Sequence, residues 1–315
     1  MVKKFLLRLG LLGAGLVGGV VAGETALRLL KPPAVSGGIA QTRFPVGQLT
    51  DYTPDDECGY LPRINGQFYG AQGCVYNDYK LEKPAGKRRI LFIGDSVTHR
   101  GRIIDKLRKL YGNVNYEYWN AGVESFNTAQ EVALYRRYNH LIKPDMVVLT
   151  FHNNDFMQTP LVYREKGKLQ LLTPLHDRDH INTWLFEYSY IYRCYVGRTW
   201  RGDQDEKAVR VRQNLQELQK LIAADGAQLK VILLPLMRPL KDYDQGENWS
   251  RDHALAITQD LHLSTIDLAP ALEEILVQKK PVEETKGDYW HPNQWAADHL
   301  AKYLYDHGLL NSKET

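Results

Sequence analysis

The fold class is decided by one stretch of the chain, Arg89-Ile90-Leu91-Phe92-Ile93-Gly94-Asp95-Ser96-Val97-Thr98. A short run of large apolar residues that ends in glycine is typical of a buried strand in an α/β sheet. Directly after it, residues 101–111 carry apolar side chains at helical spacing, with charged side chains on the opposite face. Ser96 therefore lies between the end of a strand and the start of a helix.

Two roles are open to Ser96 from this segment alone. Ligands and catalytic groups of α/β proteins gather at the carboxyl ends of strands, where a following helix adds oriented N–H groups. A serine in that place can act as a nucleophile. It can equally well cap the N-terminus of the helix.

The rest of the chain alternates between strand and helix patterns. We expect strands at 114–119, 146–151, 229–235 and 264–268, and helices at 128–141, 205–224, 250–261 and 293–307. Such alternation predicts a three-layer α/β/α fold with a doubly wound parallel sheet. Residues 55–79 suggest short strands or a β-hairpin. Residues 156–202 interrupt the alternation and are predicted to be an aromatic-rich insertion or helical cap.

The N-terminus has the pattern of a membrane-targeting segment. Lys3, Lys4 and Arg8 precede an uncharged apolar run over 9–23, which indicates a secretory signal or a signal anchor with its basic end in the cytoplasm. Because the apolar pattern resumes before residue 31, we expect an uncleaved anchor helix over 1–31. Cleavage after residues 20–22, giving a secreted protein, is the alternative.

The segments after the anchor complete the predicted domain organisation. Residues 32–54 are rich in Pro, Gly, Ser and Thr and are predicted to be a linker. The main domain is predicted over 55–311, on the extracytoplasmic side of the membrane, in a periplasmic or extracellular space. Its acidic and basic residues are interspersed, with 40 Lys and Arg against 37 Asp and Glu, so no nucleic-acid partner is expected.

The three cysteines fit an oxidising compartment. Cys58 and Cys74 flank a short segment and can pair into a local disulfide there. Cys194 is then left over and is expected to be a buried apolar residue. Neither the cysteines nor His176, His180 and His253 have the spacing of metal ligands, so no metal site is predicted.

Residues of catalytic type follow several predicted strands, and these strand ends converge on one edge of the sheet. A serine nucleophile needs a base to take its proton, and the base needs an orienting acid. Ser96, His291 and Asp288 supply all three groups. The oxyanion of an acyl-transfer intermediate needs N–H donors, for which we expect the N–H of Ser96, a backbone N–H within 122–125, and the Asn154 side chain.

These residues resemble the SGNH, or GDSL-like, hydrolases over roughly residues 88–307. The first block of that family is matched by residues 94–97, the third by Asn154-Asp155, and the fifth by Asp288-x-x-His291. The resemblance implies a flavodoxin-like SGNH hydrolase fold, with Ser96 as nucleophile, His291 as base and Asp288 as acid. It implies no metal and no organic cofactor.

Two positions depart from the family pattern. The second block has a glycine five positions after its asparagine, and counting from Asn120 that position is Ser125. Serine keeps the N–H but tolerates positive φ poorly, so we expect the loop to hold a conformation allowed for non-glycine residues. Ser125 is then the third oxyanion donor, and Gly122 is a turn residue. His152 replaces the glycine of the third block and is expected to be a packed neighbour of the site.

Two further polar residues near Ser96 receive structural interpretations. Asp95 is expected to form hydrogen bonds that support the fold, and His99 is expected to be a surface histidine. The leading hypothesis is a membrane-anchored, extracytoplasmic serine esterase or deacylase that acts on an O-acyl ester of the cell envelope, in a polysaccharide or lipid. The alternatives are an O-acyltransferase with the same triad and a non-catalytic envelope-binding or assembly module.

Overall fold

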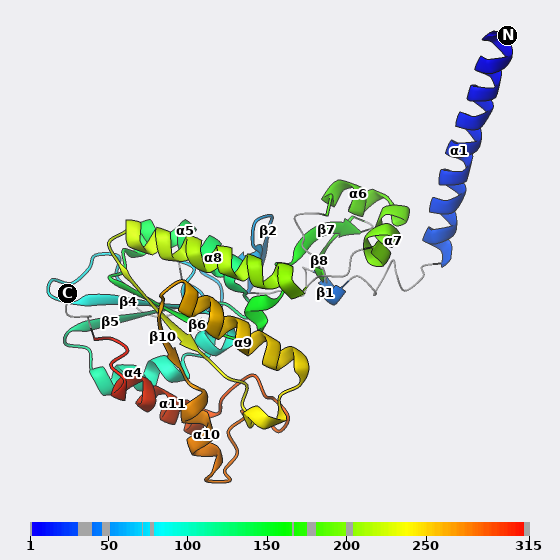
Figure 1. The fold of residues 1–315 in the computed structure, drawn as a ribbon. Coiled ribbons are helices and arrows are strands. Elements are labelled where there is room, and N and C mark those ends of the chain that lie inside the picture. The colour runs from blue at the N-terminus through cyan, green and yellow to red at the C-terminus, as the bar shows by residue number, and fades with distance from the viewer. Residues whose placement is uncertain are drawn as a thin grey trace. The chain divides into compact units, whose positions relative to one another are not determined.

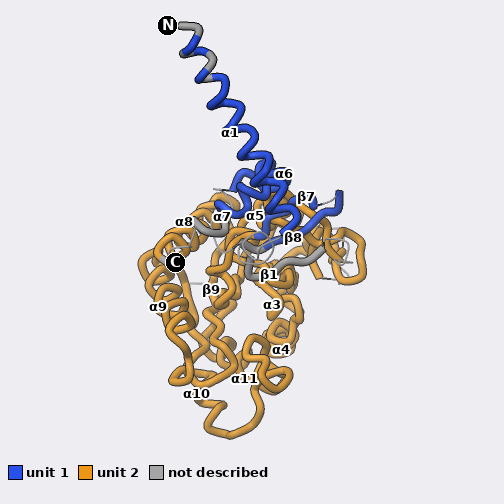
Figure 2. The backbone as a smooth tube through the Cα atoms, turned by 90° about the vertical axis from the view of Figure 1, so that its right-hand side faces the viewer, with its two compact units in different colours: residues 1–48, 160–203 blue, residues 49–159, 204–315 orange. Residues whose placement is uncertain are grey.

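A computed structural model describes residues 2–30, 40–45, 51–70, 72–75, 79–165, 167–174, 181–199 and 204–311. The chain divides into two compact units (Figure 2). Unit 1 combines residues 1–48 with 160–203, and unit 2 combines residues 49–159 with 204–315. Each unit has its own hydrophobic core.

The centre of unit 2 is a five-stranded parallel sheet. Its strand order is β10-β9-β6-β4-β5. Counted along the chain this is the flavodoxin-like order 2-1-3-4-5, in which the winding direction reverses beside the first strand, β4. The predicted doubly wound parallel sheet is therefore confirmed. The strands are β4 (Arg88–Gly94), β5 (Tyr116–Gly122), β6 (Met146–Phe151), β9 (Gln228–Leu233) and β10 (Ser264–Asp267).

Helices cover both faces of this sheet, which gives the three predicted layers (Figure 1). Side chains alternate between the two faces of a strand. Ile90 and Phe92 of β4 belong to the core under α4, α10 and α11, so Leu91 and Ile93 face the opposite layer, formed by α5 and α8. These helices are α4 (Arg102–Tyr111), α10 (Ala269–Leu276), α11 (Gln294–Asp306), α5 (Thr128–Ile142) and α8 (Gln204–Ala224).

Shorter elements of unit 2 surround the carboxyl ends of the strands. Two strands, β2 (Tyr52–Asp55) and β3 (Gly59–Pro62), form the hairpin expected in this region. The others are α3 (Ser96–Arg100) and the 3₁₀ turns η2 (Asn153–Phe156) and η4 (Leu240–Asp242).

A longer helix, α9 (Gln245–Asp260), follows η4. It begins five residues before the expected start, because Asp244 and Glu247 form a capping box at its N-terminus.

Unit 1 contains a three-stranded antiparallel sheet in the order β1-β8-β7. Its strands are β1 (Ala40–Pro45), β7 (Leu161–Glu165) and β8 (Lys168–Pro174), and its helices are α1 (Val2–Leu30), α6 (Thr183–Tyr188) and α7 (Tyr190–Thr199). The predicted linker 32–54 overlooked β1, because that strand pairs with β8, more than a hundred residues later. It also overlooked most of β2, which begins at residue 52. The linker residues 32–39 and 46–50 lie outside the described part of the chain.

The N-terminal helix α1 is apolar over most of its length. By length and composition the segment Gly10–Leu30 is long enough to cross a membrane, a property that a signal sequence shares. No residue of that segment is fully buried, although residues 23, 24 and 27 are half-buried.

The disulfide that Cys58 and Cys74 could form is not present, since both cysteines are free and buried. They belong to separate substructures. Cys58 ends the β2–β3 turn, where its carbonyl accepts a hydrogen bond from Gln130 of α5 (2.7 Å). Cys74 lies beside β5, because the N–H of the next residue, Val75, donates to the Asn120 carbonyl (2.7 Å). Burial raises the pKa of both thiols to about 12. Cys194 is partly exposed, contrary to expectation.

Arg89 is a fully buried cation at the start of β4 and provides a test of the fold. Its guanidinium pairs with Glu117 (2.9 Å), donates to the carbonyls of Lys80, Leu81 and Ile142, and lies over the Trp119 ring. Replacement by Met leaves these acceptors unpaired, so we expect Arg89→Met to lower the free energy of unfolding by about 3 kcal/mol. Urea denaturation measures this, and a loss as small as that of the neighbouring control Arg88→Met would contradict it.

Candidate active site

Two glycines shape the corner between β4 and α3. Gly94 has φ 154°, and a Cβ there would lie 2.2 Å from the Thr98 hydroxyl oxygen. A Cβ on Gly122 would lie 2.2 Å from the backbone nitrogen of His99. Only glycine permits such close approaches. Gly122 is the last residue of β5, and the backbone of α3 packs directly on it. The prediction that Gly122 is a turn residue was therefore wrong.

Polar side chains hold both ends of α3. Asp95 is the N-cap, and its carboxylate accepts the N–H of Val97 (2.9 Å). At the other end, the Asn120 amide donates to the Thr98 carbonyl (2.8 Å). Asp95 therefore has the structural role expected of it. Because Asp95 is the cap, the Ser96 hydroxyl is left for another partner.

That partner is His291, which joins Ser96 to Asp288. The Ser96 hydroxyl lies 2.8 Å from His291 Nε2, and His291 Nδ1 lies 2.8 and 3.0 Å from the two Asp288 oxygens. Burial opposes the charge of Asp288, but hydrogen bonds from His291 and from the N–H of Trp290 outweigh it and lower the pKa of this carboxyl. The structure thus brings the three predicted side chains together in the order serine, histidine, acid.

The loop that carries Asp288 and His291 is tied down at several points. Its two sides pair with each other where the N–H of Glu284 donates to the His291 carbonyl (2.9 Å). Arg102 of α4 donates to the Pro292 carbonyl (2.8 Å) and forms an ion pair with Glu284, as does Arg100. The sequence offered no signal for this cluster, because about 180 residues separate the arginines from the acid.

Ser125 lies in a turn over residues 123–126 that also begins at this corner. The N–H of Val123 donates to the Gly94 carbonyl (3.0 Å), and the N–H of Phe126 donates to the Val123 carbonyl (3.1 Å). Ser125 is the third residue of the turn and has φ 59°, in the left-handed region where type II turns favour glycine. The loop therefore holds Ser125 in the small left-handed region, which non-glycine residues reach only at some cost in free energy.

Asn154 is attached to the same turn. Its amide nitrogen donates to the Phe126 carbonyl (2.9 Å). An amide nitrogen carries two hydrogens, so this bond uses one of them and leaves the other for a further acceptor. The predicted oxyanion donors Ser125 and Asn154 thus belong to two loops that are joined to each other and to the end of β4, where the third predicted donor, Ser96, begins α3.

Two histidines pack around the site. His152 is buried between the Asp95 carboxylate (3.7 Å) and the Trp290 ring, as a packed neighbour should be, and burial lowers its pKa. His99 is not a surface residue, since its Nδ1 lies 3.0 Å from the Tyr69 hydroxyl and burial lowers its pKa as well. His176 and His180 lie outside the described residues.

A pair of carboxyl groups is fully buried behind the site. Asp155 accepts the N–H of His152 (2.7 Å) and the hydroxyl of Thr128 (2.8 Å). Glu131 lies within hydrogen-bonding reach of Asp155, and no other described residue pairs with either of its oxygens. Burial raises the pKa of Asp155 to about 8, and burial with the nearby Asp155 charge raises the pKa of Glu131 well above its usual range. At neutral pH this pair therefore retains protons.

A pocket of about 380 Å³ adjoins the site on the β9 side. His152, which packs beside the site, lines this pocket together with Asn153. Neither Ser96 nor the Asp288–His291 pair lines it. Its other walls are largely apolar and come from the ends of β6 and β9 and from α9. They include Phe151, Phe156, Leu233, Leu234, Leu236 and Ala254.

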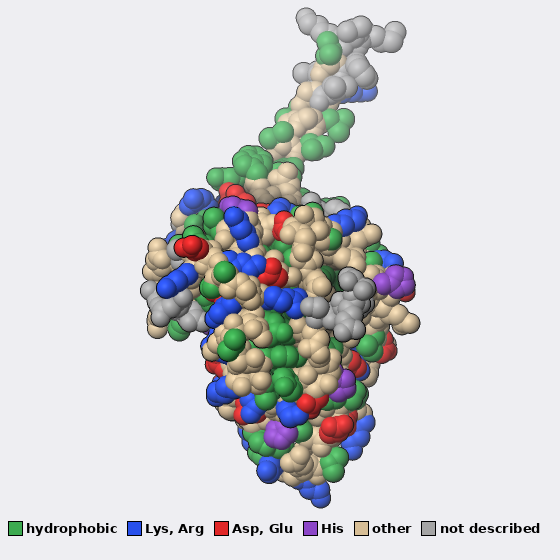
Figure 3. Space-filling view, turned by 90° about the vertical axis from the view of Figure 1, so that its left-hand side faces the viewer, with side chains coloured by type: hydrophobic (Ala, Val, Ile, Leu, Met, Phe, Trp, Pro, Cys, Tyr) green, Lys and Arg blue, Asp and Glu red, His purple; other side chains and the backbone are tan. Residues whose placement is uncertain are grey.

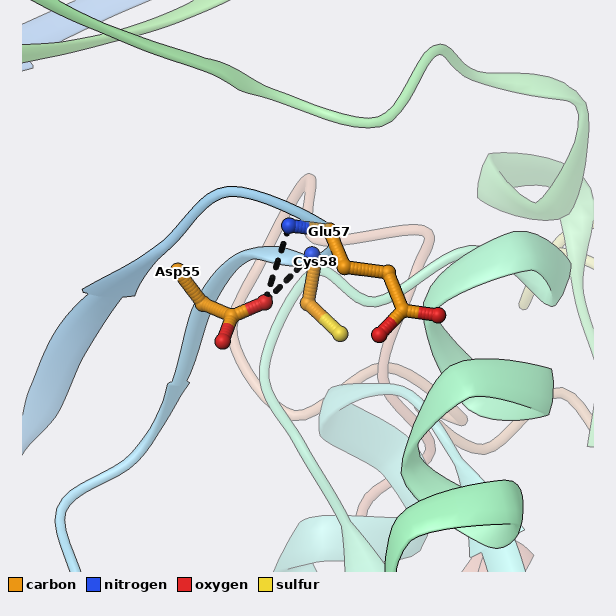
Figure 4. Close-up of side chains that lie close together, drawn as sticks. All are labelled: Asp55, Glu57 and Cys58. Atoms are coloured by element: carbon orange, nitrogen blue, oxygen red, sulfur yellow. Dashed lines mark hydrogen bonds between the residues drawn. The ribbon is translucent and has the colours of Figure 1, made fainter.

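Among the described residues, two groups of side chains are close enough to share a cation. Carboxylates of both groups already form hydrogen bonds or ion pairs within the protein. In the first, an Asp55 oxygen accepts the N–H groups of Glu57 and Cys58 (Figure 4), and Arg137 pairs with both carboxylates. The second consists of Glu284, which is paired with arginines, together with the Asp288–His291 pair of the site.

The chain is similar in fold to several solved structures. One is LAE5, an alpha/beta hydrolase from the metagenome of Lake Arreo, Spain (16% identity, 73% of this chain and 99% of that one, TM-score 0.49). Another is Axe2, an acetylxylan esterase from Geobacillus stearothermophilus (16%, 71% and 95%, TM-score 0.47). A third is a lipolytic protein of the G-D-S-L family from Veillonella parvula (14%, 71% and 100%, TM-score 0.46).

No model of a known protein family matches the sequence, and neither does any curated protein. Because the identities are low and the TM-scores lie below 0.5, the chemistry of this chain has to be argued from its own site.

The left-handed conformation of Ser125 predicts the effect of a glycine at this position. A non-glycine residue in this region costs roughly 1 kcal/mol. We therefore expect Ser125→Gly to raise the free energy of unfolding by about 0.5–1 kcal/mol while keeping the backbone N–H. Urea denaturation measures the change, and Ser125→Ala, which removes only the hydroxyl, serves as the control. A glycine variant less stable than the alanine variant would contradict backbone strain at this position.

The buried carboxyl pair predicts a pH dependence of stability. The folded-state pKa of Asp155 is about 8, whereas an unfolded aspartate titrates near pH 3.9. The folded state therefore binds its proton more tightly, so the stabilisation is fully present below about pH 4 and is lost as pH rises through about 8. We expect Glu131→Gln, which removes one acid and adds an amide donor toward Asp155, to be about 1–3 kcal/mol more stable than the wild type at pH 8.5.

Urea denaturation at pH 5 and pH 8.5 measures this dependence. The exposed Glu274→Gln on α10 is the matched control and should follow the wild type at both values. If the free energy of unfolding fell by the same amount between pH 5 and pH 8.5 in the wild type and in Glu131→Gln, a proton held by this pair would be excluded.

Proposed function

We propose that this protein is an SGNH-type serine esterase or deacylase that hydrolyses O-acyl esters through an acyl-enzyme. The observation that carries the proposal is the continuous hydrogen-bonded chain from Ser96 through His291 to Asp288. Serine is a weak nucleophile, and it becomes reactive where an oriented base can take its proton. His291 is placed to be that base.

The charged Asp288 determines which nitrogen of His291 carries the proton. A carboxylate next to Nδ1 favours the tautomer with its hydrogen on Nδ1, which leaves the lone pair of Nε2 facing the Ser96 hydroxyl. As Ser96 attacks the ester carbonyl, the proton moves to Nε2. Asp288 then stabilises the positive charge that develops on the imidazole ring.

The negative oxygen of the tetrahedral intermediate needs donors beside Ser96. We assign these to the N–H groups of Ser96 and Ser125 and to the Asn154 amide. Each is held by a separate constraint: the first turn of α3, the strained turn at Ser125, and the bond from Asn154 to the Phe126 carbonyl. Donors held in place before the reaction stabilise the developing charge without further reorganisation.

Collapse of this intermediate releases the alcohol, which takes the proton from His291. The acyl group remains on Ser96. Water then enters, His291 removes its proton, and attack on the acyl-enzyme gives the free acid and regenerates Ser96. No step in this sequence calls for a metal or an organic cofactor.

The N-terminal segment supports a location at the cell envelope. Basic residues before an apolar helix favour an orientation with the N-terminus in the cytoplasm and the rest of the chain on the other side. We therefore assign the esterase to the extracytoplasmic face of the membrane, where acylated polysaccharides or lipids are the available esters. The helix α1 would serve as its anchor.

A fluorophosphonate probe and a short-chain nitrophenyl ester test this function. We expect the wild type to be labelled and to hydrolyse the ester. Ser96→Ala should lose labelling and at least about a thousandfold in kcat, and Asp288→Asn at least about a hundredfold. The control Ser264→Ala, on the edge strand β10, should behave like the wild type.

Two outcomes would overturn the proposal. Folded wild-type protein that takes no label would favour the non-catalytic binding module. Transfer of the acyl group to an added carbohydrate, with none released to water, would favour the acyltransferase.

A further inference from the structure

The outer surface of α6 and α7 is aromatic. Trp184 and Tyr188 are 66% and 57% exposed and lie side by side on α6, and Tyr195 of α7 is 54% exposed. Among the described residues, these are the only aromatic side chains that are more than half exposed. The inner side of the same helices supplies the core of unit 1 through Phe186 and Val196. The aromatic surface is therefore additional to what the fold requires.

The last turns of α1 are fastened to the junction of these two helices. The Glu24 carboxylate accepts the N–H groups of Tyr190 (2.8 Å) and Ile191 (3.1 Å), at the N-terminus of α7. Arg28 donates to the Tyr188 carbonyl (2.6 Å), and its guanidinium lies over the Tyr190 ring. In the ribbon and tube views, α6 and α7 lie beside the C-terminal end of α1 (Figures 1 and 2).

These contacts begin where the apolar part of α1 ends. Residues 5–23, in which Arg8 is the one charged residue and can extend its guanidinium to the interface, form about 28 Å of helix at a rise of 1.5 Å per residue. This length is close to the roughly 30 Å of a bilayer core. Figure 3 shows hydrophobic side chains and bare backbone along most of the described part of α1, whereas acidic and basic side chains are interspersed on the rest of the surface in view. Glu24 and Arg28 come directly after residues 5–23, at the depth where the lipid headgroups begin.

We infer that α6 and α7 form an aromatic platform, Trp184, Tyr188 and Tyr195, that lies in the headgroup layer of the bilayer crossed by α1. Tyrosine and tryptophan favour that layer, because their rings are apolar and their polar groups remain in contact with water. The Glu24 and Arg28 contacts hold the platform at the level where α1 leaves the lipid. The inference rests on the proposed membrane anchoring and adds to it a second, lipid-facing surface.

Depth-dependent fluorescence quenching tests the platform in the full-length protein. The protein is reconstituted into nanodiscs of phosphatidylcholine and phosphatidylglycerol, with or without phosphatidylcholine brominated near the top of its acyl chains. The signal of Trp184 is obtained by subtracting the spectrum of Trp184→Phe from that of the wild type. We expect bromine to quench this difference signal by about twofold, as for a tryptophan in the headgroup layer.

Two variants separate the platform from a general effect of the lipid. Glu24→Ala removes the hydrogen bonds from Tyr190 and Ile191 of α7 to α1 and should reduce quenching of Trp184 while the protein stays in the nanodisc. Tyr305→Phe, an exposed aromatic on α11 of unit 2, is the matched control and should leave the quenching unchanged.

The outcomes distinguish the platform from the anchor. Protein that remains in carbonate-washed nanodiscs with an unquenched Trp184 overturns the platform and leaves the anchor intact. Protein that washes off the lipid overturns both. Self-association in detergent that is abolished by Trp184→Ser, with no quenching in nanodiscs, would make the surface an interface between copies and would also overturn the inference.

Discussion

The contact of α3 with the end of β5 is the constraint on which the site depends. The backbone nitrogen of His99 lies so close to Gly122 that no side chain fits between them. Because of this contact the chain turns sharply after β4, and Ser96 becomes the first residue of a helix whose backbone packs against the neighbouring strand β5. Gly94 permits the bend on the other side of the same corner. Every proposed group of the site is positioned relative to this corner.

The site is completed by segments that are distant in sequence but attached to that corner. The turn bearing Ser125 starts with a hydrogen bond to the end of β4. The loop bearing His291 is joined to α4 through Arg102 and to the end of β9 through the N–H of Met237, which donates to the Tyr289 carbonyl (2.7 Å). Because several independent bonds position the loop, the hydroxyl and the imidazole meet at hydrogen-bond distance without a rigid element between them.

The acids around the site divide according to their environment. Asp288 is partly exposed and accepts bonds from His291 and Trp290, so it stays charged. Glu131 is completely buried beside a second acid and is held in its neutral form. Residue type alone does not separate these states, since desolvation favours the protonated acid and hydrogen bonds favour the carboxylate. Only the acid that receives enough donors can balance the charge of an imidazolium.

The sequence by itself determined the alternation of strands and helices and the order of the motifs at the strand ends. Buried strands such as β4 and β6 are short continuous runs of apolar residues, and amphipathic helices such as α5 and α8 repeat their apolar residues about every four positions. A short window of sequence detects both patterns. Tertiary structure decided what depends on distant partners: the strand β1 paired with β8, the separation of Cys58 from Cys74, and the burial of His99. It also decided the contact between Ser96 and His291, 195 residues apart. Local periodicity specifies which face of an element is apolar, but a long-range contact forms only where packing brings two segments together.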